Sequence, residues 1–196
     1  TTDLLNELDI KYGYLANDQD VHTGIKIYSI KTDLARQLKK LNAKVEAGLK
    51  WNVIQTTNDL EAMVWSANEF KADTGRTNLF TYTETNYAAY ASFSQKINKW
   101  EYQFGVRAEQ SVTKGRSIDL KNSRIDYPDT SYFNLFPTAF VRYTVNDKNS
   151  LGFSYGRRIN RPTYQDLNPF EYIYDNYSRE KGNPYLQPEF SHNFEV

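Results

Sequence analysis

The sequence predicts an all-β chain whose antiparallel strands run up and down through a membrane as a segment of a β-barrel wall. Three observations predict this class. Apolar and polar side chains alternate with period two along several segments, and short and long connections alternate between those segments. The segments are also longer than the roughly five or six residues usual in soluble sheets. About eight long strands are expected from this pattern.

The first expected strand lies near the start of the chain, and its apolar side chains are Leu8, Ile10, Tyr12 and Tyr14. The next segment, residues 24–38, is less regular, because Ile25 and Ile27 fall on one parity and the later apolar residues on the other. A β-bulge near Ile27 would reconcile the two. A helix over residues 33–41 is the alternative for its last part, although such a run is too short to be stable without tertiary support.

The remaining segments alternate more strictly. Their outward sets begin with Val45, Ala47, Leu49, Trp51 and Val53. The same pattern continues in residues 78–97, 100–114, 132–147 and 151–156. Since successive side chains of a strand leave opposite faces, each of these segments has one apolar and one polar face.

The connections between the expected strands are of two kinds. The short ones are residues 38–42, 96–99 and 146–149, and the long ones are residues 15–23, 58–77, 113–131 and 157–187. In an antiparallel meander every second connection lies at the same end of the sheet. All tight turns are therefore expected at one end and all long loops at the other, as in outer-membrane barrels.

Residues 98–110 show what the two faces mean. Trp100, Phe104 and their neighbours of equal parity form an aromatic face, and Arg107 and Glu109 lie on a charged one. In a membrane barrel the aromatic face meets lipid and the charged face lines the lumen. In a soluble sandwich or barrel the aromatic face would fill a closed core instead. The three tryptophans are expected near the membrane interfaces; they are Trp51, Trp65 and Trp100.

Composition excludes several classes of protein. The 24 basic and 24 acidic side chains balance, and there is no cysteine, so neither nucleic-acid binding nor thiol chemistry is expected. No apolar run approaches a transmembrane helix of about 20 residues, and no signal peptide is expected at the start. His22 and His192 lack neighbouring ligands at metal spacing. No enzyme motif is found, so no catalysis, metal or cofactor is expected.

Candidate site residues are of two kinds. The first are charged residues whose parity faces the lumen, where they could form ion pairs along the wall or contact a plug or substrate: Arg107, Glu109, Arg142 and Arg158. The second lie in the long proline-rich connection 157–187, which could be a binding loop or a lid: Arg161, Tyr164, Asp166 and Asn168. Arg157, Arg158 and Arg161 also form a basic cluster, but it lacks the basic surroundings of a nucleic-acid site.

Several strings in the C-terminal third carry a family resemblance. They are FP at 136–137, NDKN at 146–149, YGRRINRP at 155–162, YQDLNPF at 164–170 and GNPYLQPE at 182–189, with YQFGVRAE at 102–109 upstream. In these strings the chain resembles the outer-membrane β-barrel family of TonB-dependent-receptor type found in Bacteroidetes. The resemblance implies a 22-stranded barrel in the outer membrane of a Gram-negative cell. It also implies an N-terminal plug, uptake of a bound nutrient, and energy delivered through TonB.

Residues 1–196 are accordingly expected to be a partial barrel domain, with the plug and the remaining strands absent. The expected partners are outer-membrane lipid, the plug of the same full-length chain, TonB and an unknown extracellular ligand. Two other functions stay open at this point. One is an outer-membrane surface or assembly barrel without transport, and the other is a soluble all-β module that binds carbohydrate.

Overall fold

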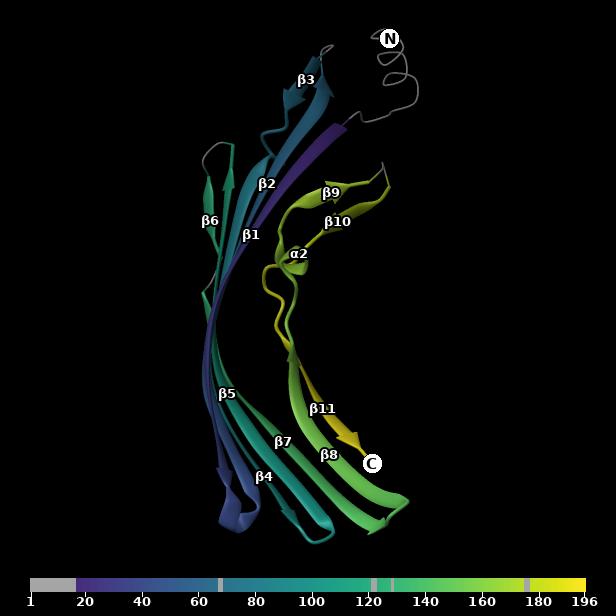
Figure 1. Ribbon diagram of the computed structural model, residues 1–196. Helices are drawn as coiled ribbons and strands as arrows, with labels where there is room; N and C mark the ends of the chain where they lie inside the picture. The colour runs from purple at the N-terminus through teal and green to yellow at the C-terminus, as the bar shows by residue number, and fades with distance from the viewer. Residues whose placement is uncertain (1–16, 67–68, 121–122, 128, 175–176) are drawn as a thin grey trace.

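The computed structural model describes residues 17–66, 69–120, 123–127, 129–174 and 177–196, and one curved antiparallel sheet dominates it (Figure 1). The main path of the sheet runs in the order β1-β2-β4-β5-β7-β8-β11. The strand expected at residues 8–14 lies outside the described residues. Among the described residues, no helix has the length and apolar character needed to cross a membrane.

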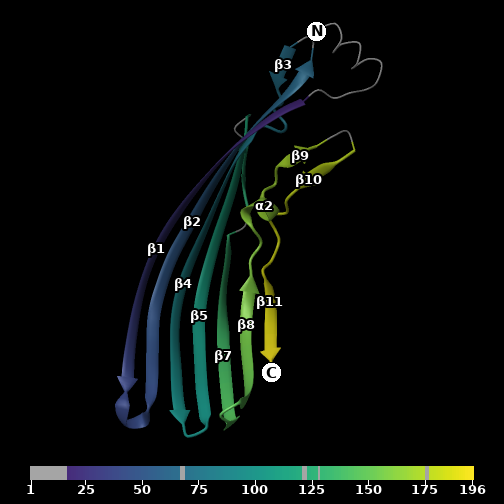
Figure 2. The same cartoon turned by 45° about the vertical axis from the view of Figure 1, so that its right-hand side comes forward.

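The strands of the main path lie side by side in chain order (Figure 2). They are β1 (Asn17–Leu38), β2 (Ala43–Ser66), β4 (Asn78–Ile97), β5 (Trp100–Asp119), β7 (Thr130–Asn146), β8 (Asn149–Asn160) and β11 (Glu189–Glu195). Short strands extend two hairpins: β3 (Glu69–Ala72) pairs with β2, and β6 (Arg124–Asp126) pairs with β5. The remaining elements are the 3-10 turn η1 (Lys39–Leu41), the helix α2 (Tyr164–Leu167) and the pair β9 (Glu171–Ile173) and β10 (Arg179–Lys181).

The up-and-down topology and the clustering of tight turns at one end are confirmed. The turns after β1, β4 and β7 all lie at the lower end of the sheet (Figure 2). Asn42 and Asn98 adopt positive φ angles of 47° and 52° in two of these turns, and asparagine tolerates that region better than most residues. The helix considered for residues 33–41 is wrong, because β1 continues to Leu38 and only Lys39–Leu41 turn as a 3-10 helix.

The bulge expected near Ile27 is also wrong. The register of β1 with β2 runs without a shift from Asn17 opposite Val64 to Leu38 opposite Ala43. Ile27 therefore lies on the concave face opposite Ile54, and 66% of its surface is exposed. Ile25 and Ile54 lie beside it on the same face, and some exposed apolar surface is common in folded proteins, so no shift of register is needed to hide Ile27.

The long connections are shorter and more regular than expected. Residues 17–23 belong to β1, and β2 continues to Ser66 before turning back as β3. Within 113–131, β5 continues to Asp119, and β6 is joined to it through ion pairs of Arg116 and Arg124 with Asp126. These strands extend because polar side chains pair across hairpins as well as apolar ones do.

The two faces of the sheet differ as the sequence predicts. The convex face carries large exposed side chains such as Trp100 and Phe104, which are 43% and 48% exposed. Near the turns the ring of Trp100 lies 6.0 Å from Tyr102 and 4.6 Å from Tyr143, as in an aromatic girdle. The concave face carries the charged residues of opposite parity, including Arg107 and Glu109.

Introducing an arginine at each of two adjacent positions tests this assignment of the faces. Phe104→Arg places a guanidinium on the convex face and is expected to cost about 2–4 kcal/mol at mid-depth in a bilayer, which blocks assembly. Gln103→Arg places the same group on the concave face and should be tolerated. Heat-modifiable mobility of the outer-membrane fraction on SDS gels measures both, and equal yields of folded protein would contradict the assignment.

The ladder between β7 and β8 ends before the strands do. The last pair is Thr138 opposite Gly156, and above it β7 pairs only with β5 while β8 pairs only with β11. The carbonyl of Leu135 accepts a hydrogen bond of 2.9 Å from the guanidinium of Arg157, so the backbone groups of Leu135 face β8. Pro137 faces the same way two residues later and has no N–H to donate, which ends the ladder at this point.

Candidate functional site

Residues 161–188, here called the inward segment, fold back against the upper part of the concave face (Figure 1). Phe170 of this segment packs with Leu60 of β2 and Phe80 of β4, and these three side chains are at most 3% exposed. Around them lie four partly buried side chains, Val21, Tyr82, Tyr127 and Tyr172. An apolar cluster on the polar side of the sheet thus attaches the segment to the wall.

Polar contacts continue this attachment towards β1. The amide of Gln19 donates to the Glu171 carbonyl at 3.4 Å, and its oxygen accepts from the Ile173 N–H at 3.3 Å. Asn58, which is 1% exposed, donates to the hydroxyl of Tyr172 at 3.4 Å. The segment therefore contacts strands that precede it by more than 100 positions in the chain.

Two of the predicted loop residues stabilise the backbone of the inward segment. The hydroxyl and the N–H of Thr163 both donate to the Asp166 carboxylate at 2.7 Å, forming a capping box at the start of α2. These bonds lower the pKa of Asp166, so its stabilising contribution is lost as the pH falls through that lowered pKa. Asn168, 1% exposed, donates to the Tyr172 hydroxyl at 3.2 Å and accepts the Phe170 N–H at 3.1 Å.

The return of the inward segment passes very close to α2. A Cβ atom added to Gly182 would lie 2.4 Å from the Asn168 carbonyl oxygen and 2.6 Å from that of Asp166. The next N–H, of Asn183, donates to the Asp166 carbonyl at 2.6 Å. Only glycine allows this approach, so Gly182 determines how the segment closes on itself.

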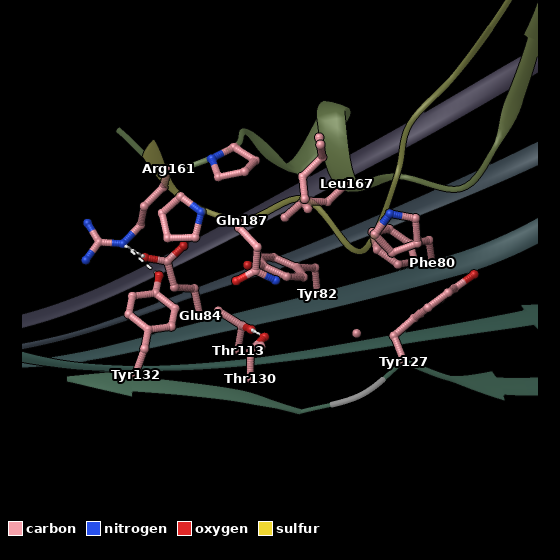
Figure 3. A pocket seen from close by; sticks show the side chains of 15 residues that line it. Phe80, Tyr82, Glu84, Thr113, Tyr127, Thr130, Tyr132, Arg161, Leu167 and Gln187 are labelled. Atoms are coloured by element: carbon pink, nitrogen blue, oxygen red, sulfur yellow. Dashed lines mark hydrogen bonds and ion pairs between the residues drawn. The ribbon is translucent and has the colours of Figure 1, made fainter. Parts of the chain in front are cut away.

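Arg161 connects the inward segment to the wall electrostatically (Figure 3). Its Nε lies 3.4 Å from the Glu84 carboxylate and donates to the Tyr132 hydroxyl at 3.3 Å, and its Nη2 forms an ion pair with Glu109. Nη2 also donates to Ser111 Oγ at 3.0 Å. The side chains of Glu84 and Glu109 are only 13% and 6% exposed. Buried carboxylates need such partners, because an unpaired charge away from water is costly.

The predicted lumen residues all lie on the concave face. Arg107 pairs with Glu109 at 3.0 Å, and its guanidinium lies 5.0 Å from the ring of Phe136. Arg142 forms an ion pair with Glu101 of the neighbouring strand. Arg158 shares its parity with Gly156 and lies opposite Ser191 of β11. Only Arg107 and Glu109 join the network of Arg161; whether any of the four contacts a plug or a substrate stays a prediction.

The loop candidates are likewise divided. Arg161 is in the network described above, whereas Asp166 and Asn168 are used within the segment, and Tyr164 is the partly buried first residue of α2. Glu84, Tyr132 and Ser111 were not predicted. Parity could have indicated Glu84, since it lies two residues before Asn86 in the polar row of residues 78–97, but nothing in the sequence indicates that Arg161 folds back to reach it.

A recess of about 660 Å³ lies on the concave wall directly below this network, bounded on its upper side by Arg161 and Glu84. A narrower gap between the inward segment and the wall lies above Glu84, lined by aromatic and proline side chains (Figure 3). The arrangement can bind a solute on the wall and restrict its passage. Among the described residues, no group of three or more His, Asp or Glu is arranged to hold a metal ion.

Comparisons with known proteins agree with this architecture. A family model described as "Outer membrane protein beta-barrel family" matches residues 3–196. Among solved structures, the chain is similar to the ferric citrate transporter FecA in its unliganded form, with a TM-score of 0.53 and 12% identity. The match covers 73% of this chain and 22% of that chain, so this chain spans under a quarter of the transporter's length. At this identity the likeness is one of fold. No curated protein sequence matches the chain.

Proposed function

The chain belongs to the outer membrane protein beta-barrel family, and from that premise we propose that it forms part of the wall of a larger TonB-dependent-type receptor that takes up an extracellular nutrient. Membership in the family places the chain in the outer membrane of a Gram-negative cell. The alternative of a soluble carbohydrate-binding module is therefore wrong. Uptake and binding, without catalysis, are the role proposed here.

The sheet itself supports the proposal of a larger barrel. β1 and β11 are its edge strands within the described residues, and only a closed barrel leaves no unpaired strand edge in lipid. Further strands are accordingly proposed to complete the wall, and residues 1–196 to be one part of it. The strand number of 22 that the family resemblance implies is part of the same proposal.

The observation that carries the transport proposal is the inward segment on a polar concave wall. A surface barrel used only for adhesion needs loops that project outward, whereas here residues 161–188 narrow the interior and border a recess of about 660 Å³. A solute that enters from outside would meet this recess after passing the segment. The plug of the same full-length protein is proposed to lie against the concave wall below the inward segment, near Arg142 and Arg158, and TonB to act through that plug.

A growth experiment on the complete protein tests this proposal. Deleting its gene is expected to abolish growth on at least one limiting nutrient in a panel of sole carbon, iron and phosphorus sources. Deleting TonB in the same strain should reproduce that defect. The parent strain must carry the folded barrel in its outer membrane. Unchanged growth of the deletion strain on every nutrient would then favour the surface or assembly role.

A further inference from the structure

The recess below the inward segment has a small residue as its floor. Ala88 of β4 lies in one row of the sheet between Lys50 of β2 and Glu109 of β5. Asn86 and Tyr90 flank it along β4 and project from the same face, and all five side chains line the recess. A methyl group ringed by long side chains leaves a hollow of about 660 Å³, which is the size of a small-molecule site.

Nearly all charges around this hollow are paired. Glu109 contacts both Arg107 and Arg161, and Glu84 contacts Arg161. Lys31 pairs with Asp33 at 2.9 Å. Lys50 is the exception, because its side chain is exposed and makes no ion pair or hydrogen bond with the described residues. With Asp33 beside Lys31, three carboxylates face four cations around the hollow, Lys31, Lys50, Arg107 and Arg161, which leaves one positive charge in excess, that of Lys50.

The register makes this excess local. Lys50 lies directly opposite Lys31 on the neighbouring strand. Like charges in directly opposite positions destabilise a sheet, and an anion between two such ammonium groups removes the repulsion. Lys31 is itself held beside the Tyr90 ring, 5.7 Å from its centroid, so one ammonium is positioned at the rim of the hollow while the other has no partner.

We propose that this recess binds a small solute carrying a phosphate or carboxylate group, with Lys50 as its principal cation and Lys31 as the second. Asn52, which lies two residues from Lys50 and lines the same hollow, supplies an amide donor. Tyr90, which is partly exposed, supplies aromatic surface for the body of the solute. This inference gives the chemical class of the solute that the receptor would take up. It rests on the proposed function for the statement that the solute is transported.

Binding to the complete protein in detergent tests the site without any transport. The probes are inorganic phosphate and glucose 6-phosphate, with glucose as the uncharged match, measured by isothermal titration calorimetry at low salt. Glucose 6-phosphate is expected to bind more tightly than glucose. Lys50→Gln should weaken that binding by roughly tenfold or more, as the loss of a hydrogen bond to a charged group does. Lys50→Arg should retain it.

Lys44→Gln is the matched control. Lys44 lies on the same strand and face, nearer the turns, and already pairs with Glu46 at 2.6 Å. Ala88→Leu fills the floor while leaving every charge in place, and it should also abolish binding. The site is overturned if neither phosphate probe binds, or if Lys50→Gln binds glucose 6-phosphate as tightly as the parent and Lys44→Gln proteins.

The two proposals can fail separately. If Lys50→Gln loses anion binding while TonB deletion leaves growth unchanged, the anion site is supported and the transport role is contradicted. A TonB-dependent growth defect together with equal binding of all variants would do the reverse.

Discussion

Replacing Arg161 by methionine is expected to destabilise the folded protein by about 1.5–3 kcal/mol, the usual contribution of hydrogen bonds to charged groups. The reason is that Glu84, with a side chain only 13% exposed, loses its ion pair, whereas Glu109 keeps Arg107 at 3.0 Å. Methionine keeps most of the length and apolar volume of arginine, so packing changes little. Urea unfolding of the complete protein in detergent measures the change.

Two further variants separate charge from packing. Arg158→Met removes a guanidinium that is exposed, only three residues earlier in the chain, and should change stability by less than about 1 kcal/mol. Adding Glu84→Gln to Arg161→Met should recover part of the loss, since the buried charge disappears with its partner. A double variant no more stable than Arg161→Met alone would show that Glu84 is not the stranded charge.

Phe170→Ala is expected to release the inward segment from the wall while the strands stay paired. The ring of Phe170 is 3% exposed and lies 6.3 Å from that of Phe80, edge to face. Truncating a buried phenylalanine costs about 3–5 kcal/mol, and here the cost falls on a contact between segment and sheet. Hydrogen exchange of the backbone amides in residues 163–188 should therefore accelerate strongly, while those of β4 and β5 exchange as before.

Tyr177→Ala is the control for this variant, because Tyr177 belongs to the same segment and is 97% exposed. It should leave the exchange of residues 163–188 unchanged. If Phe170→Ala also left it unchanged, the apolar cluster would not be what attaches the segment. If it accelerated exchange in β4 and β5 equally, the wall would depend on the cluster as much as the segment does.

The sequence was sufficient to predict which side chains share a face of the sheet and at which end the tight turns lie, because both depend on local features of the chain. Alternation with period two depends only on the strand itself, so Phe104 and Gln103 could be assigned to opposite faces without knowing the neighbours. Tight turns are equally local, as at residues 38–42 and 146–149. The extent of β2 and β5 was missed because several buried residues of their upper ends are polar, such as Asn58 and Ser117, so hydrophobic alternation does not mark the burial.

The site depends on contacts that the sequence does not encode locally. Glu109 was predicted to face the lumen, but its burial comes from Arg161, 52 residues later, folding back over it. Asp166 and Asn168 were candidates in a connection that could be a binding loop or a lid, and the structure shows both holding turns of their own segment. Lys50 stands out only when the register places it opposite Lys31 and the other cations are seen to be paired.

The early end of the β7–β8 ladder places a charged side chain within the lipid-facing part of the wall. From Asn146 to Thr138 the paired part of β7 rises roughly 27 Å at ~3.4 Å per residue, which a tilt of about 40° reduces to roughly 21 Å of height. Exposed apolar side chains of the convex face continue above this level at Leu135 and Phe133. A guanidinium facing lipid there would be costly, but that of Arg157 donates to the Leu135 carbonyl and lies 4.5 Å from the Phe190 ring. Above the ladder the two strands are thus joined by a side chain in place of backbone hydrogen bonds.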